Sequence, residues 1–596
     1  MCGAIHLSWL LEFNRKTIFH GVSTNAETFS REQVGLRPTM TNNDAKQRIP
    51  SSGNNVNQFV GRDCCFLALL TALYSVFYVY RLGFYWDDWY ILKLFHFSDD
   101  QSMSGLLRQL AMGFPDTVAR PVQAIHLAIL YRVFGLTPLG YHLVNTLTFC
   151  LGVCVFYLAL RELTGRRVTS LSTITLFGLL PHYSTDRFWY ATFNGNISMV
   201  FYFLSLSCNV REVTTGKRSV WKWKTMTAVS LVCSCLAYEV FMPLFLLNPI
   251  VCEIKRRHLK LSGARVSGRP VGPLLSFLLN PALLAIISIF KARASPRLSG
   301  GLGLWLVHDG FQASLDLTAR AYLIKLPRIL WSIFTKYWDG TAVFLAFLVF
   351  AIVASYLSGA ARRSQELRVR SLLLICIVLG STVIAGMSYA YLYSYYGIDV
   401  GGNNRVAIAA AAPVAISWIR LAQLISRYAA GAVMQKYVFS VIVGLLCGAG
   451  CLITNCVALF WIDGAQKQYE IMSDLKRALP APPKGSSILL EGLCWTGQGL
   501  IFESGLDVRG ALPLLYEDKT IRSELVRPWL KATPEGVQAG KDAVHSFQSL
   551  YFYDVLNKEA DRVMDETQAI AYIEKATQDD VQGCMTSKFG TDLPVW

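Results

Sequence analysis

The chain has little charge for its length. Only 16% of its 596 residues are Asp, Glu, Lys or Arg, whereas 53% are hydrophobic. A soluble protein carries about 25% charged residues, so this composition excludes an ordinary soluble enzyme. Several apolar stretches are long enough to cross a bilayer, which takes about 20 residues in a helix. The sequence therefore predicts an α-helical polytopic membrane protein surrounded by the lipid bilayer.

Nucleotide-binding and metal-binding motifs are absent as well. The sequence contains no Walker, Rossmann or zinc motif and no internal repeat. Most of its fifteen cysteines lie inside apolar segments without metal-ligand spacing, as expected of small buried hydrophobes. Cys494 and Cys584 fall in a region that could be soluble and oxidising, which leaves a disulfide between them as an option.

The basic residues do not form a single stripe. The net charge is +16, but Lys and Arg gather in short runs between apolar segments, for example "RELTGRR" (161–167) and "ARRSQELRVR" (361–370). Such runs mark the cytoplasmic loops of membrane proteins. We therefore expect no nucleic-acid partner.

The charges also orient the chain. Basic residues precede the first apolar run, so residues 1–62 are predicted to be a disordered cytoplasmic tail and residues 85–140 a large external loop. Within that loop, a helical pattern between Pro121 and Pro138 predicts an amphipathic helix on the membrane surface, because a crossing there would place three later basic runs outside. The transmembrane domain, 63–462, then has about eleven spans: about 64–84, 141–160, 168–182, 194–210, two short helices in 225–252, 272–290, 340–358, 371–388, 406–424 and 437–461.

The tail at 463–596 differs sharply in composition and holds half of the acidic residues in less than a quarter of the chain. The segments "SSILLEGL", "GLIFES" and "LYFYDVL" predict short strands, and the regions around 518–531 and 559–577 predict helices. We expect a small α/β domain on the external side of the membrane.

Two adjacent carboxylates, Asp87 and Asp88, follow the first span in "FYWDDWYIL". Their mutual repulsion and the apolar surface raise the pKa of such a pair, which would suit one of them to act as a general base near neutral pH. The alternative is an interfacial cap beside a belt of Trp and Tyr. The sequence alone leaves both interpretations open.

Basic residues on the same face could bind a phosphate or pyrophosphate group. The candidates are Arg405, Lys325, Arg328 and Arg120, the last at the start of the surface helix. The alternative for Lys325 and Arg328 is contact with lipid headgroups. Arg405 is favoured as a ligand because "GGNN" provides a flexible approach before a span rich in Gly and Ala.

Three further residues are candidates for binding the acceptor or a metal ion. Glu239 lies at the expected turn between two short helices, in "LAYEVFMP". His182 and Asp186 are four residues apart and would share one face if the segment were helical. A solvated carboxylate and hydrogen-bonded loop residues are the alternatives, and no metal set is assigned.

One base and several cations suffice for one kind of reaction. A hydroxyl deprotonated by Asp87 or Asp88 attacks an anomeric carbon whose leaving group is a lipid phosphate. Such a leaving group needs no proton donor, unlike the alcohol that a glycosidase expels. In-line attack then inverts the anomeric configuration.

Four segments carry a resemblance to a known family: "YWDDWYIL", "RPVQAIHLAILYRVFGLTPLGYHLVNTLTFCLGVCVFYLALREL" (120–163), "PHYSTDRFWYATFN" and "LAYEVFMPLFLL". In order and spacing they resemble the GT-C superfamily of polyprenyl-phosphate-sugar-dependent glycosyltransferases, in its protein O-mannosyltransferase and aminoarabinose-transferase-like branch. The resemblance implies an acidic base in the first external loop, which maps to Asp87, and a basic ligand for the donor phosphate, for which Arg405 is the best match. Some members bind a divalent cation and others need none, so no cofactor is assigned. The family often has Asp-Glu where this chain has Asp-Asp, so the roles of the two acids stay open.

The sequence therefore predicts an inverting glycosyltransferase that moves a sugar from a polyprenyl-phosphate donor to a hydroxyl acceptor (envelope glycan, lipid or protein). A bacterial inner (plasma) membrane, with the site on the periplasmic face, is the predicted location. The alternatives are a transporter or flippase of lipid-linked saccharides and a non-catalytic membrane scaffold. A transporter is expected to show an internal repeat and paired broken helices, neither of which the sequence shows.

Overall fold

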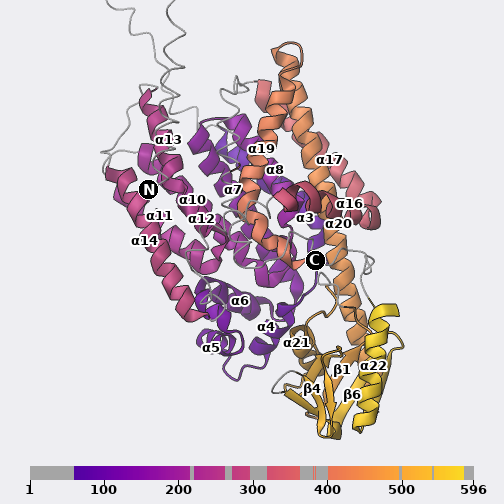
Figure 1. Cartoon of the computed structure of the whole chain (residues 1–596). Coiled ribbons are helices and arrows are strands. Elements are labelled where there is room, and N and C mark those ends of the chain that lie inside the picture. Colours follow the sequence, from indigo (N-terminus) through magenta and orange to yellow (C-terminus); the bar gives the residue numbers. More distant parts are fainter. Residues whose placement is uncertain are drawn as a thin grey trace, which may run out of the picture. The chain divides into compact units, whose positions relative to one another are not determined.

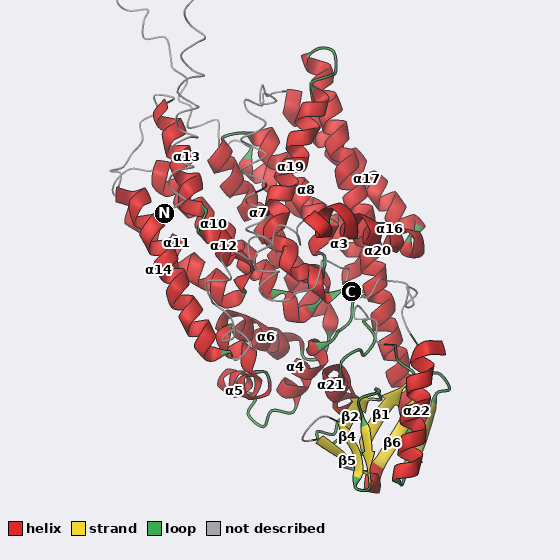
Figure 2. Cartoon of the chain, viewed as in Figure 1, coloured by secondary structure: helices red, strands yellow, loops and turns green. Residues whose placement is uncertain are grey.

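The computed structural model describes residues 59–214, 220–261, 271–295, 319–362, 401–494, 500–539 and 543–582, together with positions 380, 383 and 585. Most of these residues are helical, and strands occur near the C-terminus (Figure 2). The predicted class is confirmed: an α-helical polytopic membrane protein with a small C-terminal α/β domain.

Six helices in the described part of the chain are long and apolar enough to cross a membrane: Val60–Val79, Pro138–Thr164, Phe277–Ala294, Gly340–Ala361, Asn404–Ser426 and Ala432–Ala478. They lie in α3 (Val60–Val79), α7 (Pro138–Thr164), α14 (Val271–Ala294), α17 (Gly340–Arg362), η9 with α19 (Ile408–Ser426), and α20 (Ala432–Ala478). The helices α8 (Arg167–Leu179), α10 (Asn194–Thr214) and α11 (Val220–Ala237) pack among them (Figure 1). The predicted span at 371–388 lies outside the described residues.

The sequence explains where these helices begin and end. In α7, Pro138 occupies the first turn, where its missing N–H costs nothing, and Gly165 ends the helix in a left-handed conformation with φ 68°. After α11 the chain turns through η6 (Glu239–Phe241) and α12 (Met242–Phe245) into α13 (Asn248–Leu261). The expected interruption near Glu239 is therefore present.

The loop at 85–140, predicted to be external, forms three short helices, α4 (Asp87–His96), α5 (Met103–Gly113) and α6 (Pro121–Phe134). At about 1.5 Å per residue, the 14 residues of α6 reach only about 21 Å, less than the about 30 Å of a bilayer core. This length agrees with the expected surface helix. Figure 1 shows α4, α5 and α6 below the lower ends of the bundle helices, with α4 beside α21 of the C-terminal domain.

The C-terminal domain follows α20, which continues as one helix beyond the expected boundary at 463. A four-stranded sheet has the order β2-β1-β6-β7, with β1 (Ser487–Glu491) parallel to β2 (Arg522–Leu525) and β6 (Leu550–Asp554), and β7 (Glu559–Val563) antiparallel to β6. A second sheet joins β3 (Lys531–Thr533), β4 (Gly536–Ala539) and β5 (Ala543–Ser546). The helices are α21 (Gly505–Tyr516) and α22 (Glu566–Gln582).

Three local predictions in this domain are wrong. "GLIFES" forms no strand, the region 518–531 contains β2 instead of a helix, and 559–577 begins with β7 before α22 starts. The helix begins earlier because Ser504 and Asp507 form a capping box at the start of α21. Residues 522–525 are then drawn into the sheet by pairing with β1, which outweighs their local helical spacing.

The described residues form two large hydrophobic cores. The bundle core joins α3, α7, α8, α10, α17, α19 and α20. The second core joins α4, α5 and α6 to the end of α20, β1 and α21. The loop at 85–140 and the C-terminal domain thus share one core, although more than 300 residues of sequence separate them.

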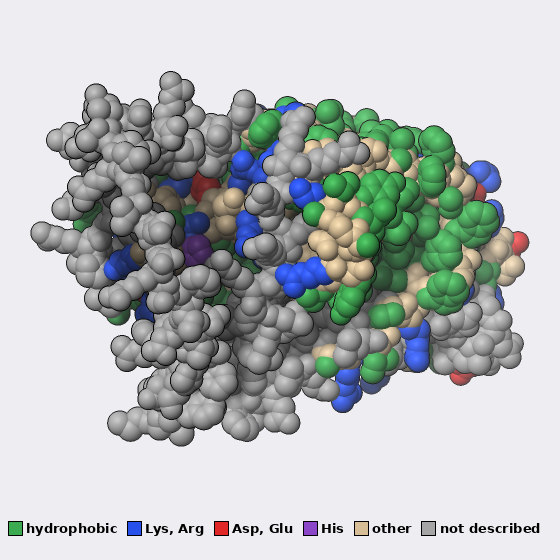
Figure 3. All heavy atoms as spheres, turned by 90° about the horizontal axis from the view of Figure 1, so that it is seen from above, with side chains coloured by type: hydrophobic (Ala, Val, Ile, Leu, Met, Phe, Trp, Pro, Cys, Tyr) green, Lys and Arg blue, Asp and Glu red, His purple; other side chains and the backbone are tan. Residues whose placement is uncertain are grey.

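The opposite end of the bundle has a different surface. Seen from the end where α13 and the α19–α20 turn lie, the described surface carries many Lys and Arg side chains and few Asp or Glu (Figure 3). A basic surface at one end of a bundle of apolar helices is typical of the cytoplasmic side.

Candidate functional site

The two predicted acids begin α4 directly after a strained residue. Trp86 has φ 44° and ψ −123°, a left-handed conformation that a bulky side chain rarely adopts. Such strain persists where the surrounding structure enforces it, often at functional sites. It places Asp87 and Asp88 in the first turn of α4, where backbone N–H groups and the helix dipole favour carboxylates.

The two acids have different surroundings. Asp88 is fully buried, and its two oxygens accept hydrogen bonds of 2.9 Å from the backbone N–H groups of Tyr85 and Ala191. Burial raises the pKa of Asp88 well above its usual value, against the effect of these donors. Asp88 therefore ties α4 to η4 (Tyr190–Thr192), whereas Asp87 is half-buried.

Aromatic rings surround this turn. The ring of Trp86 lies 4.6 Å from that of Trp189 and 5.7 Å from that of Trp461. Trp189 donates its indole N–H to the carbonyl of Tyr85 at 3.2 Å. At Gly402 a Cβ atom would lie 2.9 Å from the Trp86 ring, so a side chain there would displace the ring.

Arg405 lies against the same aromatic residues. It belongs to η9 (Gly402–Ala407), and its guanidinium lies 5.2 Å from the centre of the Trp189 ring. Nη1 donates to the Gly402 carbonyl at 2.7 Å, and Nε lies 3.3 Å from the hydroxyl of Tyr238. The edge-to-face pair of Trp86 and Trp189 thus connects Arg405 with the turn that carries Asp87.

A second group of charges adjoins Tyr238. The Nε of Arg120 lies 3.1 and 3.2 Å from the two carboxylate oxygens of Glu239, and the Arg120 guanidinium lies 5.0 Å from the Tyr238 ring centre. Lys291, on α14, donates to Glu239 and to the carbonyl of Ala119, both at 2.8 Å. We call Arg120, Lys291, Arg405 and Glu239 the cation cluster.

The cation cluster carries an excess of positive charge. Burial raises the pKa of Glu239, but the charges of Arg120 and Lys291 lower it to about 2. Glu239 is therefore ionised, and the four residues of the cluster comprise three cations and one anion; the charge of Arg405 also acts on the buried carboxyl group of Asp186. Lys291 was missed in the sequence because it directly follows the predicted span at 272–290, where a Lys is ordinary.

The other predicted residues are distributed differently. His182 and Asp186 lie in separate short helices, η3 (Pro181–Tyr183) and α9 (Thr185–Phe188), so they do not share one helical face. Burial raises the pKa of Asp186 well above its usual value, although the charges of Arg405 and Arg187 oppose this. Among the described residues, no group of three or more His, Cys, Asp or Glu side chains has the arrangement of a metal site.

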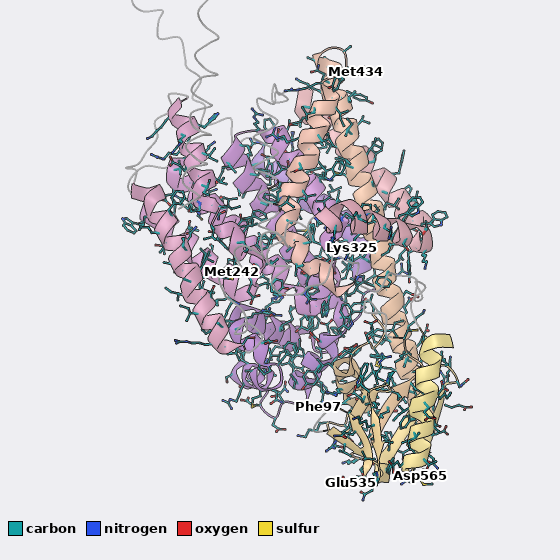
Figure 4. The ribbon with its side chains drawn as sticks, viewed as in Figure 1. Phe97, Met242, Lys325, Met434, Glu535 and Asp565 are labelled. Atoms are coloured by element: carbon teal, nitrogen blue, oxygen red, sulfur yellow. The ribbon has the colours of Figure 1, made fainter. Side chains whose placement is uncertain are left out.

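Lys325 and Arg328 lie on a different part of the bundle. Lys325 ends η8 (Arg320–Lys325), and Arg328 is exposed on α16 (Leu326–Tyr337), which packs against α20. Figure 4 labels Lys325, which lies on the α16 side of the bundle. The structure therefore supports the grouping of Arg405 and Arg120, together with Lys291, more closely than that of Lys325 and Arg328.

Comparison with known proteins gives one sequence match and several structural matches. No family model matches the chain. It is 32% identical over 145 residues to the protein O-mannosyl-transferase Tmtc1 of Drosophila melanogaster, a match that covers 23% of this chain and 16% of the fly protein. The predicted resemblance to the protein O-mannosyltransferase branch is confirmed over these 145 residues.

The structural matches are more distant. They are ArnT from Cupriavidus metallidurans in the apo state (14% identity, TM-score 0.31) and bound to undecaprenyl phosphate (14%, 0.30), and the Archaeoglobus fulgidus oligosaccharyltransferase tethered with an acceptor peptide (10%, 0.36). These matches cover 77%, 77% and 78% of this chain and 84%, 85% and 64% of the respective matched chains. Because these TM-scores are low, the resemblance rests on the sequence match.

Proposed function

We propose that this protein is an integral-membrane inverting glycosyltransferase that moves a sugar from a polyprenyl-phosphate donor to a hydroxyl acceptor. The observation that carries the proposal is that Asp87, in a strained turn, is connected through Trp86 and Trp189 to Arg405, which adjoins the partly buried Arg120 and the buried Lys291. A carboxylate base and a group of cations for the phosphate are what this transfer needs. The partial match to an O-mannosyl-transferase supports the same class of reaction.

In this mechanism Asp87 is the base. It takes the proton of the acceptor hydroxyl while the acceptor oxygen forms a bond to the anomeric carbon of the donor sugar. The bond from that carbon to the phosphate oxygen breaks, and its electron pair leaves on the lipid phosphate. Arg405 and the neighbouring Arg120 and Lys291 stabilise the developing negative charge, so no second carboxylic acid is needed.

Asp88 has a supporting role in this proposal. Both of its oxygens accept backbone hydrogen bonds, which fix the turn that presents Asp87. This division of roles supports Asp87 over Asp88 as the base, the question that the sequence left open.

The external position of the site draws support from the C-terminal domain. Cys494 is disulfide-bonded. Its expected partner, Cys584, lies outside the described residues, next to Met585, whose backbone pairs with Gly492 and Cys494. Disulfides persist in oxidising compartments, and the domain shares its core with α4. We propose that both face the external side, and we keep the bacterial inner membrane as the proposed location.

The test is sugar transfer from a polyprenyl-phosphate donor by the purified protein in nanodiscs. We expect Asp87→Asn to lower kcat by about 10²–10⁴-fold with an unchanged melting temperature, as for loss of a general base. Asp88→Asn is expected to lower the melting temperature as well. Glu535→Gln, in the turn between β3 and β4, is the matched control. Full activity of Asp87→Asn would contradict the mechanism.

A further inference from the structure

The segment that leads into the Asp87 turn lies along one face of α20. That face carries three residues spaced four and three positions apart: Trp461, Ala465 and Gln468. The Trp461 carbonyl accepts the hydroxyl of Tyr85 at 2.9 Å. A Cβ atom at Gly83 would lie 2.9 Å from the Cβ of Ala465, so a side chain there would force the two segments apart.

The side chain of Gln468 reaches both sides of the turn. It is 1% exposed, its Oε1 accepts the indole N–H of Trp89 at 2.9 Å, and its Nε2 donates to the Phe84 carbonyl at 3.3 Å. An indole N–H can only donate and a carbonyl can only accept, so these two partners fix the orientation of the amide. The two hydrogen bonds therefore bracket residues 85–88, which include the strained Trp86 and both acids.

Other side chains fix the same segment at single positions: Asp88, Trp189 and His142. A bulky residue with the backbone conformation of Trp86 persists only where its surroundings over-determine it. Gln468 is fastened to the chain before and after Trp86. We therefore expect the loss of Gln468 to let this turn relax and to move the carboxyl group of Asp87.

We propose that Gln468 is a positioning residue: by bridging Phe84 and Trp89 it holds the Asp87 carboxylate in the orientation that sugar transfer requires. This inference rests on the proposed function, in which Asp87 is the base. Gln468 is buried, so it acts through the turn and not by contact with a substrate. The helix that carries it, α20, continues into the C-terminal domain (Figure 1), so one helix holds both the turn and the domain.

The test measures sugar transfer from the polyprenyl-phosphate donor in nanodiscs by Gln468→Met, which keeps the length of the side chain and removes both hydrogen bonds. We expect kcat to fall about 10–100-fold, because a small misplacement of a reacting group has an effect of this size. The Kd for a polyprenyl phosphate that carries no sugar is expected to change less than about twofold, because the cation cluster lies on other elements.

Gln423→Met is the matched control. Gln423 is also fully buried, near the end of α19 opposite to Arg405, and its amide accepts from Arg420 at 2.8 Å and donates to the Thr169 hydroxyl at 3.0 Å. The two substitutions remove the same amide and the same number of hydrogen bonds, so we expect similar losses of melting temperature. The large fall in kcat is expected for Gln468→Met alone.

Two further variants show whether Gln468 acts through Asp87. In the Asp87→Asn background the base is already lost, so Gln468→Met is expected to lower the residual rate less than about twofold. A general defect of folding would lower both rates by the same factor. Gln468→Glu keeps an oxygen that accepts from Trp89 but loses the amide donor to Phe84, so an intermediate kcat is expected.

The outcomes separate this inference from the proposed function. A wild-type kcat in Gln468→Met, an equal fall in Gln423→Met, or an undiminished further fall in the Asp87→Asn background overturns the inference. If Asp87→Asn loses activity while Gln468→Met behaves as Gln423→Met, the inference alone fails. If Asp87→Asn is fully active, or the wild type transfers no sugar, both the proposed function and the inference fail.

Discussion

Two buried ion clusters at different places in the bundle contain the same residue types but differ in their expected roles. In one, Asp63 of α3 accepts from Arg167 of α8 at 2.7 and 2.6 Å, from the Tyr157 hydroxyl at 2.5 Å and from the Tyr356 hydroxyl at 2.8 Å. In the other, Glu239 accepts from Arg120 and Lys291. The first cluster joins four helices, and the second joins the turns and ends of elements beside the proposed site.

The difference lies in charge balance. Asp63 binds one cation directly, Arg167, and two hydroxyls occupy its remaining acceptor positions. A second cation, Arg161, contacts only the Tyr157 hydroxyl, at 3.2 Å. Glu239 binds two cations directly, Arg120 and Lys291, and Arg405 adjoins them through Tyr238. We call a carboxylate with one direct cation balanced and one with two direct cations unbalanced, and we expect only the unbalanced cluster to favour an anion nearby.

The largest expected effect comes from breaking the balanced cluster. Asp63→Asn leaves Arg167 buried without its counter-ion, which typically costs about 3–5 kcal/mol of unfolding free energy. Thermal unfolding in detergent measures it. Asp99→Asn is the control, because Asp99 and Lys519 form an exposed ion pair of 3.3 Å whose loss is expected to change little. Equal melting temperatures for the two variants would contradict a structural role for Asp63.

The second prediction concerns the loss of folding stability at acidic pH. The pKa of Glu239 is lowered to about 2 in the folded protein, below an unfolded value of about 4.3. A lowered carboxyl pKa contributes stability that is fully present above the unfolded pKa and is lost as pH falls through the folded one. The shift corresponds to about 3 kcal/mol. Unfolding measured from pH 5 to pH 2 is therefore expected to show a loss that Glu239→Gln lacks, and parallel curves for the two proteins would refute it.

The sequence alone predicts the helix bundle, the two ion clusters and the C-terminal domain to different extents. The order of the helices follows from apolar runs and basic loops, and "FYWDDWYIL" with "GGNNR" already pointed to Asp87 and Arg405. Lys291 could not be found, because its role depends on the packing of α14 against Ala119 and Glu239. The β2 strand was misread as helix because pairing with β1 decides its structure. The meeting of α21 with α4 is a long-range contact that no local pattern encodes.

The third prediction removes one cation from the cation cluster and leaves the ion pair of Arg120 and Glu239 in place. Lys291→Met keeps the ion pair of Arg120 and Glu239 and replaces the ammonium by an apolar group of similar length. We expect a smaller loss of melting temperature than for Asp63→Asn, because Glu239 keeps Arg120 as a counter-ion, and a rise of about tenfold in the KM for the polyprenyl-phosphate donor, the worth of one charge-assisted hydrogen bond. A stability loss as large as that of Asp63→Asn, with an unchanged KM, would make this cluster structural as well.

The smallest expected effect tests the contact between the two parts of the cation cluster. Tyr238 lies under Arg120 and within 3.3 Å of Arg405 through its hydroxyl. Tyr238→Phe keeps the ring beneath Arg120 and removes only the hydrogen bond to Arg405, so the donor KM is expected to rise about threefold, in line with the net worth of one hydrogen bond. Tyr90→Phe, on α4 away from this contact, is the matched control. If Tyr238→Phe leaves the donor KM unchanged while Lys291→Met raises it, Arg405 acts independently of the pair at Glu239. The charge imbalance that distinguishes the two clusters is then due to Arg120 and Lys291 alone.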